Sequence, residues 1–238
     1  MKGTQQSLYG QRWTLIVLVF SLLIGGCAQT ERRQDPFEPF NRRMFAFNDT
    51  IDGAILKPLA KGYVTVLPAP LRMGVGNVFA NLWTPTTIIN QFLQGKPDEG
   101  VRDIARFLVN STFGVLGIFD VASRSGLEKD VEDFGQTLAV WGVPSGPYLV
   151  VPFIGPSGFR DGAGDIAGLY TYPLTYAEDE LRYPAFATEF IHQRAQLLSA
   201  EKLVGGDRYL FIRDAYLQRR ADLVRDGEAG DSDPFLDD

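Results

Sequence analysis

The side chains that could serve as a nucleophile or a base are few in this chain. His192 is the only histidine, so a serine nucleophile activated by an imidazole would depend on it. Ser157 lies in Gly-Pro-Ser-Gly, and Ser145 has a proline and a glycine beside it. Neither serine has the strand–turn–helix setting of a nucleophile elbow. The sequence therefore argues against a lipid hydrolase, which stays open as the weakest of three functional hypotheses.

Two carboxylates, Asp161 and Asp165, are spaced to lie on one face of a helix and follow Arg160 directly. Paired carboxylates can divide the roles of acid and base between them. A capped helix start with an ion pair explains the same residues without any chemistry. The sequence also has no metal-ligand spacing and no phosphate-binding loop. It predicts that the protein is not an enzyme and uses no cofactor or metal.

Cys27 is the only cysteine. It lies three residues after an apolar run at 13–24, which itself follows Lys2 and Arg12. The run is shorter than the roughly 20 apolar residues that a bilayer-spanning helix needs. Small residues precede the thiol, which is typical of a lipoprotein signal peptide at 1–26, with cleavage before Cys27 and lipidation of its sulfur. The alternative is an uncleaved signal anchor. Residues 27–34 would form the lipidated tether, and Ala28 favours sorting to the outer membrane.

Residues 134–160 carry no charge before Arg160, yet glycines and prolines interrupt them repeatedly. Each proline removes a backbone donor and each glycine weakens a helix, so one spanning helix is excluded. A bent backbone at membrane depth is tolerated only where protein buries it or where it lines a cavity. We therefore expect an apolar hairpin here, with at most short extended pieces near 148–153, in an otherwise helical fold.

This stretch resembles the signature block of the MlaA (VacJ) lipoprotein family, and the resemblance extends over roughly 35–161. The matching residues are Glu132-Asp133-Phe134-Gly135-Gln136-Thr137-Leu138, Trp141-Gly142, Gly146-Pro147-Tyr148, Pro152, Gly155-Pro156 and Arg160-Asp161. Upstream matches are Asn41, Arg42, Phe45, Phe47 and Asn48, then Lys57, Pro58 and Tyr63, then Asn110, Gly114, Gly117 and Asp120. Pro144 and Gly158 depart from the family's pattern, in which a glycine and a small hydroxyl residue are common there.

The resemblance implies a compact all-α domain that lies in the inner leaflet of the outer membrane and encloses an amphipathic channel. It implies a protein, anchored by palmitate and other acyl chains on Cys27, that takes mislocalised phospholipids from the outer leaflet. A trimeric porin would stand beside it, and a periplasmic lipid-carrier protein would receive the lipid. The channel or hinge candidates are Asn41, Phe45, Asn48, Phe134, Gln136, Trp141, Gly142, Gly146 and Tyr148. The alternative is a structural or assembly lipoprotein that binds outer-membrane proteins without moving lipid.

A helix is expected to begin near Asp35, with two candidate buried faces. The row of Phe40, Met44, Phe47 and Ile51 is predicted to be core. The neighbouring row of Asn41, Phe45 and Asn48 either faces the channel or holds a loop against the helix.

The uncharged stretch 73–95 has the length of a membrane span but contains too many amides to face lipid tails. We expect it to lie in the membrane interface, broken at Pro85, with its amides turned inward; the alternative is a buried helical hairpin. The next helix, 96–111, is predicted to pack Val101, Ile104 and Leu108 inward and to leave Arg106 in water.

Two further amphipathic helices are expected at 184–204 and 207–224, the second capped by Asp207. The helical domain is then 35–225, and the tail 226–238 has six acidic residues and no basic one, which predicts disorder. The formal net charge is −6, without a basic stripe for nucleic acid.

Overall fold

The computed structural model describes residues 35–226. The chain divides into one unit that ends at Pro36 and a second that begins at Phe37, and the fold below is that of the second unit. The expected signal peptide, Cys27, the tether at 27–34 and the tail from residue 227 lie outside the described residues.

This unit is built almost entirely of helices, as the sequence predicts. They are α2 (Glu38–Ile51), α3 (Lys57–Val66), α4 (Ala69–Leu93), α5 (Pro97–Thr112), α6 (Val121–Arg124), α7 (Phe134–Val140), α8 (Phe159–Thr171), α9 (Asp179–Gln196) and α10 (Arg208–Val224). Shorter turns of helix are η2 (Asp52–Leu56), η3 (Pro173–Tyr176) and η4 (Ala200–Leu203). Within residues 35–226 the strands are β1 (Tyr148–Val151) and β2 (Gly155–Gly158), which pair antiparallel. Strand β1 is the short extended piece expected near 148–153, and β2 lies just beyond that range.

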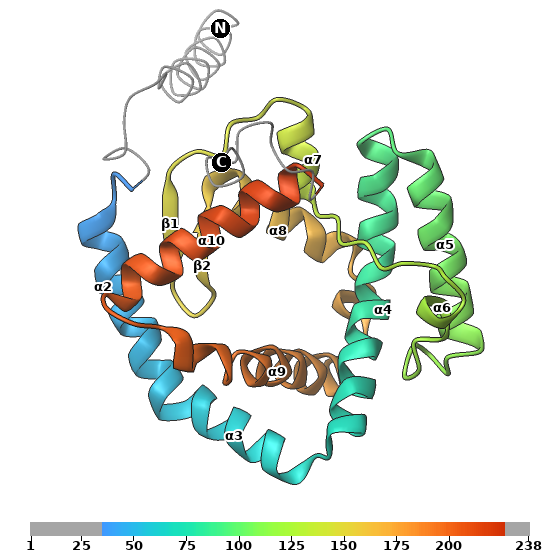
Figure 1. Ribbon diagram of the computed structural model, residues 1–238, viewed down its shortest axis with the longest axis horizontal. Coiled ribbons are helices and arrows are strands. Elements are labelled where there is room, and N and C mark those ends of the chain that lie inside the picture. The colour runs from blue at the N-terminus through green and yellow to red at the C-terminus, as the bar shows by residue number, and fades with distance from the viewer. Residues whose placement is uncertain (1–34, 227–238) are drawn as a thin grey trace, which may run out of the picture. The chain divides into compact units, whose positions relative to one another are not determined.

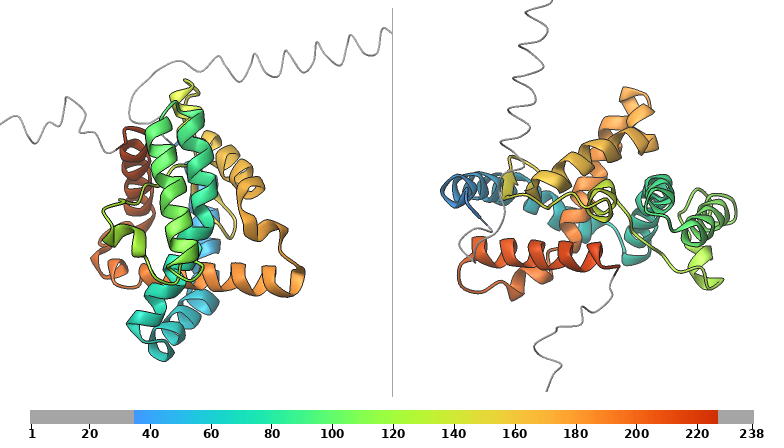
Figure 2. Two further views of the ribbon diagram at one scale, coloured as in Figure 1. Left: turned by 90° about the vertical axis from the view of Figure 1, so that its right-hand side faces the viewer. Right: turned by 90° about the horizontal axis from the view of Figure 1, so that it is seen from above.

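The helices are arranged as a chain of neighbours rather than around one central core. Ile51 and Leu56 keep helical backbone angles, so α2, η2 and α3 run on from one another (Figure 1). The helices α4 and α5 lie side by side, as Figure 2 shows from two directions. Helix α9 packs on α3, and α10 packs on α7 and β2. The hairpin of β1 and β2 is therefore held by α2, α8 and α10.

The buried apolar cluster is small and lies at this hairpin. It consists of Tyr148, Val150 and Tyr209, with Met44 and Phe45 packed against it. The rings of Phe45 and Tyr209 meet edge to face at 5.7 Å between centroids. Large apolar side chains elsewhere in the unit are exposed in unusual number for a protein whose surroundings are water alone.

The prediction for the faces of α2 is wrong for Phe40 and Phe47, although Met44 of the same row does pack against the apolar cluster. Phe40 and Phe47 are exposed, whereas Asn41 is fully buried and Phe45 packs on the apolar cluster. The reason is that the backbone of the hairpin lies against this face and needs hydrogen-bond partners, which apolar side chains could not supply.

The expected break at Pro85 is also wrong, because α4 continues through that residue. A proline there removes only the bond to the carbonyl of Asn81, and contacts with α5, α7, α8 and α9 hold the helix on either side. The amides do turn inward: Asn81, Asn90 and Gln91 are all buried.

Helix α5 is turned opposite to the prediction. Its apolar residues are on the outside, with Val101 60% exposed and Leu108 55% exposed. Its buried residues are Gly100, Asp103, Arg106 and Asn110. The periodicity is that of an amphipathic helix, but the polar face is the one that packs against protein.

The buried polar face of α5 has partners in the segment that follows it. Arg106 donates to the carboxylate of Asp120 at 2.7 Å and to the hydroxyl of Ser123 at 2.9 Å. Asn110 donates to the same carboxylate at 3.1 Å and accepts the N–H of Ala122 at 2.9 Å. Burial would raise the pKa of Asp120, but hydrogen bonds from Ser123, Arg106 and Asn110 outweigh it and hold that pKa well below its ordinary value.

Of the two predicted C-terminal helices, the first has different ends from those predicted and the second begins where it was predicted to begin. Helix α9 starts at Asp179, ahead of Pro184, and stops at Gln196, and the short turn η4 replaces its expected end. Helix α10 starts as predicted, because Asp207 accepts the N–H of Tyr209 at 3.0 Å as its cap.

Candidate functional site

Two asparagines of α2 hold the hairpin against the helix. Asn41 donates from Nδ2 to the carbonyl of Tyr148 at 3.1 Å and accepts the N–H of Val150 on Oδ1 at 2.9 Å. Asn48 acts in the same way, donating to the carbonyl of Val151 at 2.9 Å and accepting the N–H of Phe153 at 2.8 Å. These amides take the place that a third strand would have beside β1. This arrangement corresponds to the alternative in which the asparagine row holds a loop against the helix. That these asparagines also contact a moving lipid stays a prediction.

Phe45 and Tyr148 belong to the apolar cluster. Phe45 lies on α2 between the two asparagines, and its ring contacts Tyr209. The ring of Tyr148 approaches Tyr209 at 6.4 Å and Tyr216 at 5.8 Å between centroids. Both side chains therefore anchor the hairpin to α2 and α10.

Gly142 ends α7 in a Schellman motif. Its N–H donates to the carbonyl of Ala139 at 2.8 Å, and the N–H of Val143 donates to the carbonyl of Leu138 at 2.9 Å. Its φ of +84° is the left-handed conformation that this motif requires. Next to it, the indole N–H of exposed Trp141 donates to the carbonyl of Leu93 at 3.1 Å, which ties the turn to the end of α4.

Gly146 also has a positive φ, +69°. A Cβ added there would lie 3.0 Å from the Cβ of Phe159. Both this close contact and the positive φ therefore disfavour any residue larger than glycine at this position. Of the two uses that the sequence allows for these glycines, positive φ is the one present at both positions. A double alanine substitution at Gly142 and Gly146 would therefore strain the turn rather than only stiffen it.

Phe134 and Gln136 lie at the start of α7, in a polar network. Asp133 caps the helix by accepting the N–H of Gln136 at 2.8 Å. The side chain of Gln136 is buried and donates to the carbonyl of Val131 at 3.0 Å, while Phe134 is half-buried. Gln136 is thus held within the protein wall.

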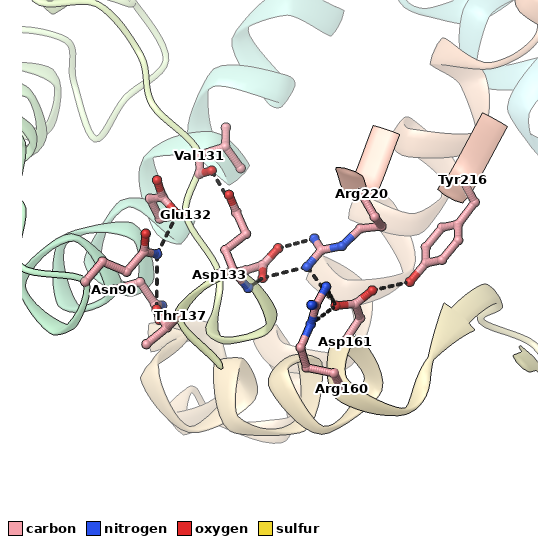
Figure 3. Close-up of polar contacts among 11 residues, drawn as sticks. Asn90, Val131, Glu132, Asp133, Thr137, Arg160, Asp161, Tyr216 and Arg220 are labelled. Atoms are coloured by element: carbon pink, nitrogen blue, oxygen red, sulfur yellow. Dashed lines mark hydrogen bonds and ion pairs between the residues drawn. The ribbon is translucent and has the colours of Figure 1, made fainter. Parts of the chain in front are cut away.

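An arginine of α10 joins this helix start to α8. Arg220 donates to Asp133 at 2.6 and 3.1 Å and to Asp161 at 3.0 Å, as Figure 3 shows. Asp161 also accepts from Arg160 and, at 2.8 Å, from the hydroxyl of Tyr216. Burial raises the pKa of Asp133, but the hydrogen bonds and charge of Arg220 outweigh it and leave that pKa below its ordinary value. Asp161 is therefore part of a structural ion-pair network.

His192 is enclosed by two neutral partners. Its Nδ1 lies 2.9 Å from the hydroxyl of Tyr63, and its Nε2 lies 2.7 Å from Nε2 of Gln196. Burial and the nearby charge of Arg72 lower the pKa of His192. Buried Ser157 bonds to a backbone carbonyl at 3.3 Å instead of to an imidazole. The described residues therefore hold no serine–histidine pair at this position.

A large groove runs between α3, α4, α9 and the segment 118–129. Its volume is about 2180 Å³, above the roughly 300–1,000 Å³ of an ordinary small-molecule pocket. Its apolar lining includes Val64, Leu67, Val75, Val78, Phe79 and Ile118, and its charged lining consists of Lys57, Lys61, Arg72, Arg124, Lys129, Asp120 and Glu201. Apolar walls with more cations than anions suit a long ligand that has hydrocarbon and a negative group.

None of the nine channel or hinge candidates lines this groove. The sequence did single out one of its walls, the uncharged stretch 73–95, and part of another through Tyr63. It gave no signal for Arg124 or Lys129, because isolated basic residues in a loop look like ordinary solvated surface. A role for the nine candidates in lipid movement stays a prediction.

Fold and groove together define a helical protein that offers a broad apolar groove with basic side chains. Among residues 35–226, none of the helices has the length and apolarity to cross a membrane. The chain belongs to the MlaA lipoprotein family, whose family model matches residues 33–223.

Two curated relatives are named as the intermembrane phospholipid transport system lipoprotein MlaA. The one from Escherichia coli is 35% identical over 227 residues, which cover 91% of this chain and 90% of the relative. The one from Haemophilus influenzae is 31% identical, over 94% of this chain and 95% of the relative. A solved structure from work on the "structural basis for maintenance of bacterial outer membrane lipid asymmetry" is 36% identical. It covers 81% of this chain and 100% of its own, with a TM-score of 0.72.

Proposed function

We propose that this protein is an outer-membrane lipoprotein that removes mislocalised phospholipids from the outer leaflet and passes them to a periplasmic carrier. Membership of the MlaA family and the names of the relatives support intermembrane phospholipid transport. The protein does so without catalysis, since no bond of the lipid has to change. Lipidation at Cys27, a place in the inner leaflet, a porin partner and the carrier are parts of the same proposal.

The inverted helix α5 is the observation that carries the proposal. A helix that presents Val101, Ile104 and Leu108 outward and buries Asp103 and Arg106 is poorly suited to water. It suits an interface in which acyl chains meet the apolar side chains. The helix is too polar overall to span, so it lies along the membrane.

The turn after α5 extends the same apolar surface. Phe113 is 77% exposed and Leu116 is 73% exposed. Val115 and Leu116 both have positive φ, 54° and 58°, which is unusual for bulky residues and costs free energy. Strain of this kind persists where it has a use, and here its effect is to direct apolar side chains outward.

The groove provides the path for the lipid in this proposal. Its apolar side chains contact the acyl chains, and its cations lower the cost of bringing a phosphate out of water. The guanidinium of Arg72 donates to the carbonyls of Val64 and Leu67, at 2.9 and 2.6 Å. No carboxylate among the described residues pairs with it, so its charge can still act on a passing phosphate.

A bulky side chain in the groove tests the proposal. Ala185 lines the groove from α9, whereas Ala187 is exposed on the same helix outside it. We expect Ala185→Trp to slow transfer of phospholipid from donor vesicles by about tenfold or more, and Ala187→Trp to leave the rate unchanged. In cells, phospholipid in the outer leaflet, scored by acylation of lipid A, should rise only with Ala185→Trp.

Other outcomes favour the alternatives. A wild-type protein that binds outer-membrane proteins and moves no lipid would be a structural or assembly lipoprotein. Release of lyso-lipid would indicate a hydrolase.

A further inference from the structure

A second pocket adjoins the groove and differs from it in chemistry. It has a volume of about 180 Å³ and lies between α4, α5 and residues 120–131. Asn77, Ala80, Asp120 and Lys129 line both spaces, so the two meet along these residues. Most of the small pocket's other lining is polar, which makes it a polar recess beside an apolar groove.

One wall of the recess has an acceptor without a donor. Asn81 is 7% exposed and uses its Nδ2 to donate to the hydroxyl of Ser111 at 2.9 Å. Its Oδ1 is buried and has no hydrogen-bond partner among the described residues. A buried polar atom left in this way is unfavourable, because it has given up its hydrogen bonds with water.

About two turns of helix away from Ser111, the recess has a carboxylate of α5 that makes one long hydrogen bond. Asp103 is 1% exposed, and its contact with Nε2 of Gln91 is long, at 3.4 Å. Burial and the neighbouring Asp130 raise the pKa of Asp103 and outweigh the opposing effects of Gln91, Arg102 and Arg106, whereas the pKa of Asp120 in the same recess is lowered. Asp120 has Arg106 as an ion-pair partner, and Asp103 forms no ion pair with the described residues.

The side chain of Lys129 lies where the recess meets the groove. Lys129 lines both spaces and forms neither an ion pair nor a hydrogen bond with any described residue. Its nearest charged neighbours act on it only through space: burial and Arg106 lower its pKa, and Asp120 opposes them. Lys129 is an exposed residue, so an anion in the groove can reach its ammonium.

We propose that the recess binds the headgroup of a phospholipid whose phosphate carries a primary ammonium, as in an ethanolamine headgroup. The ammonium donates to Asp103, the phosphate lies beside Lys129, and the acyl chains extend into the groove. This inference rests on the proposed function and adds to it the class of lipid that the protein prefers.

Binding by full-length, lipidated wild-type protein in detergent micelles tests the preference directly. Phosphatidylethanolamine is compared with its N-acetyl derivative, which lacks the charge, and with phosphatidylglycerol, all with the same acyl chains. We expect phosphatidylethanolamine to bind about tenfold more tightly than the other two. Equal affinities for the three lipids would overturn the inference and leave lipid transport intact. Failure to bind any of them would instead contradict the proposed function.

Substitutions assign the preference to the recess. Asp103→Asn has the same shape and should reduce binding of phosphatidylethanolamine to the level of phosphatidylglycerol, which should itself be unchanged. Asp98→Asn, on the exposed face of α5 outside both spaces, is the control and should behave like wild type. A preference retained by Asp103→Asn would overturn the inference.

Soluble phosphoethanolamine distinguishes a lipid headgroup from a free metabolite. We expect it to compete with the lipid only weakly, because it has no chains for the groove. Competition as strong as that of the whole lipid would overturn the assignment to phospholipid.

Discussion

Single residues of the stretch 134–160 are fixed by backbone geometry that the sequence only partly reveals. The sequence allows Gly142 to be either a flexible joint or a residue with positive φ. Its φ of +84° and the paired bonds of the Schellman motif give the second answer. No atom lies within 4 Å of an added Cβ at this position, so substitution there changes backbone energy and little else.

Replacing Gly142 should therefore affect stability according to the tolerance of each residue for left-handed backbone. Gly142→Ala should lower the free energy of unfolding by about 1–2 kcal/mol, and Gly142→Asn should cost less, because asparagine adopts this conformation more readily. Urea unfolding of the purified protein measures both. Gly62→Ala is the control, since this exposed glycine within α3 also has open space around it and should gain roughly 0.5–1 kcal/mol.

The flexible-joint interpretation makes a different prediction for the same variant. It requires Gly142→Ala to be as stable as wild type and yet slower in lipid transfer. That pair of results would contradict the fixed turn described here.

At the scale of elements, the sequence predicts the positions of the helices more accurately than it predicts which of their faces are buried. The periodicity of α5 defines an apolar row and a polar row correctly, and the standard assumption of an aqueous surface then assigns them to the wrong sides. The information that reverses the assignment lies in Asp120 and Ala122, which bind Arg106 and Asn110 only after the chain has turned back. The same reasoning applies to α2, where the hairpin decides that the asparagine row is buried.

The outward face of α5 should be a membrane-binding surface. Leu108→Lys removes an apolar contact worth about 1.5–3 kcal/mol when fully buried, so binding to vesicles should fall by about tenfold or more. The assay uses the body secreted without Cys27 and zwitterionic vesicles, because an added lysine would gain attraction from an anionic surface.

A control with the same charge change is available on α10. Gln218 is exposed beside charged residues, and Gln218→Lys should leave vesicle binding unchanged. Circular dichroism should give both variants the wild-type melting temperature. Equal vesicle binding by Leu108→Lys and wild type would contradict the interfacial role of α5.

At the scale of the whole molecule, distant segments meet in ways that periodicity does not contain. Arg220 on α10 lies 87 residues from Asp133 and 59 from Asp161, and it joins both. The sequence predicts the helix at 207–224 and the cap at its start, but it does not predict which segments that helix contacts. A pairing of this kind depends on the final packing, so a single sequence read by itself does not reveal it.

The whole molecule has two different attachments to its membrane in the proposed function. In that proposal the exposed apolar side chains of α5 and of the turn after it provide a reversible contact. One buried acyl chain alone also binds only marginally, whereas several chains together with an apolar surface bind durably. Durable attachment therefore depends on Cys27.

Loss of the thiol should separate the two attachments. We expect Cys27→Ala to abolish incorporation of radioactive fatty acid, with the signal peptide left uncleaved or cut elsewhere. Replacing residues 1–27 by an ordinary cleavable secretory signal should release a folded body that binds vesicles reversibly and dissociates on dilution. The added acyl chains contribute about 0.8 kcal/mol per buried CH₂, so the lipidated protein should remain on vesicles through the same dilution. Label retained by Cys27→Ala would contradict lipidation at this residue, and a released body without affinity for vesicles would contradict the interfacial role of α5.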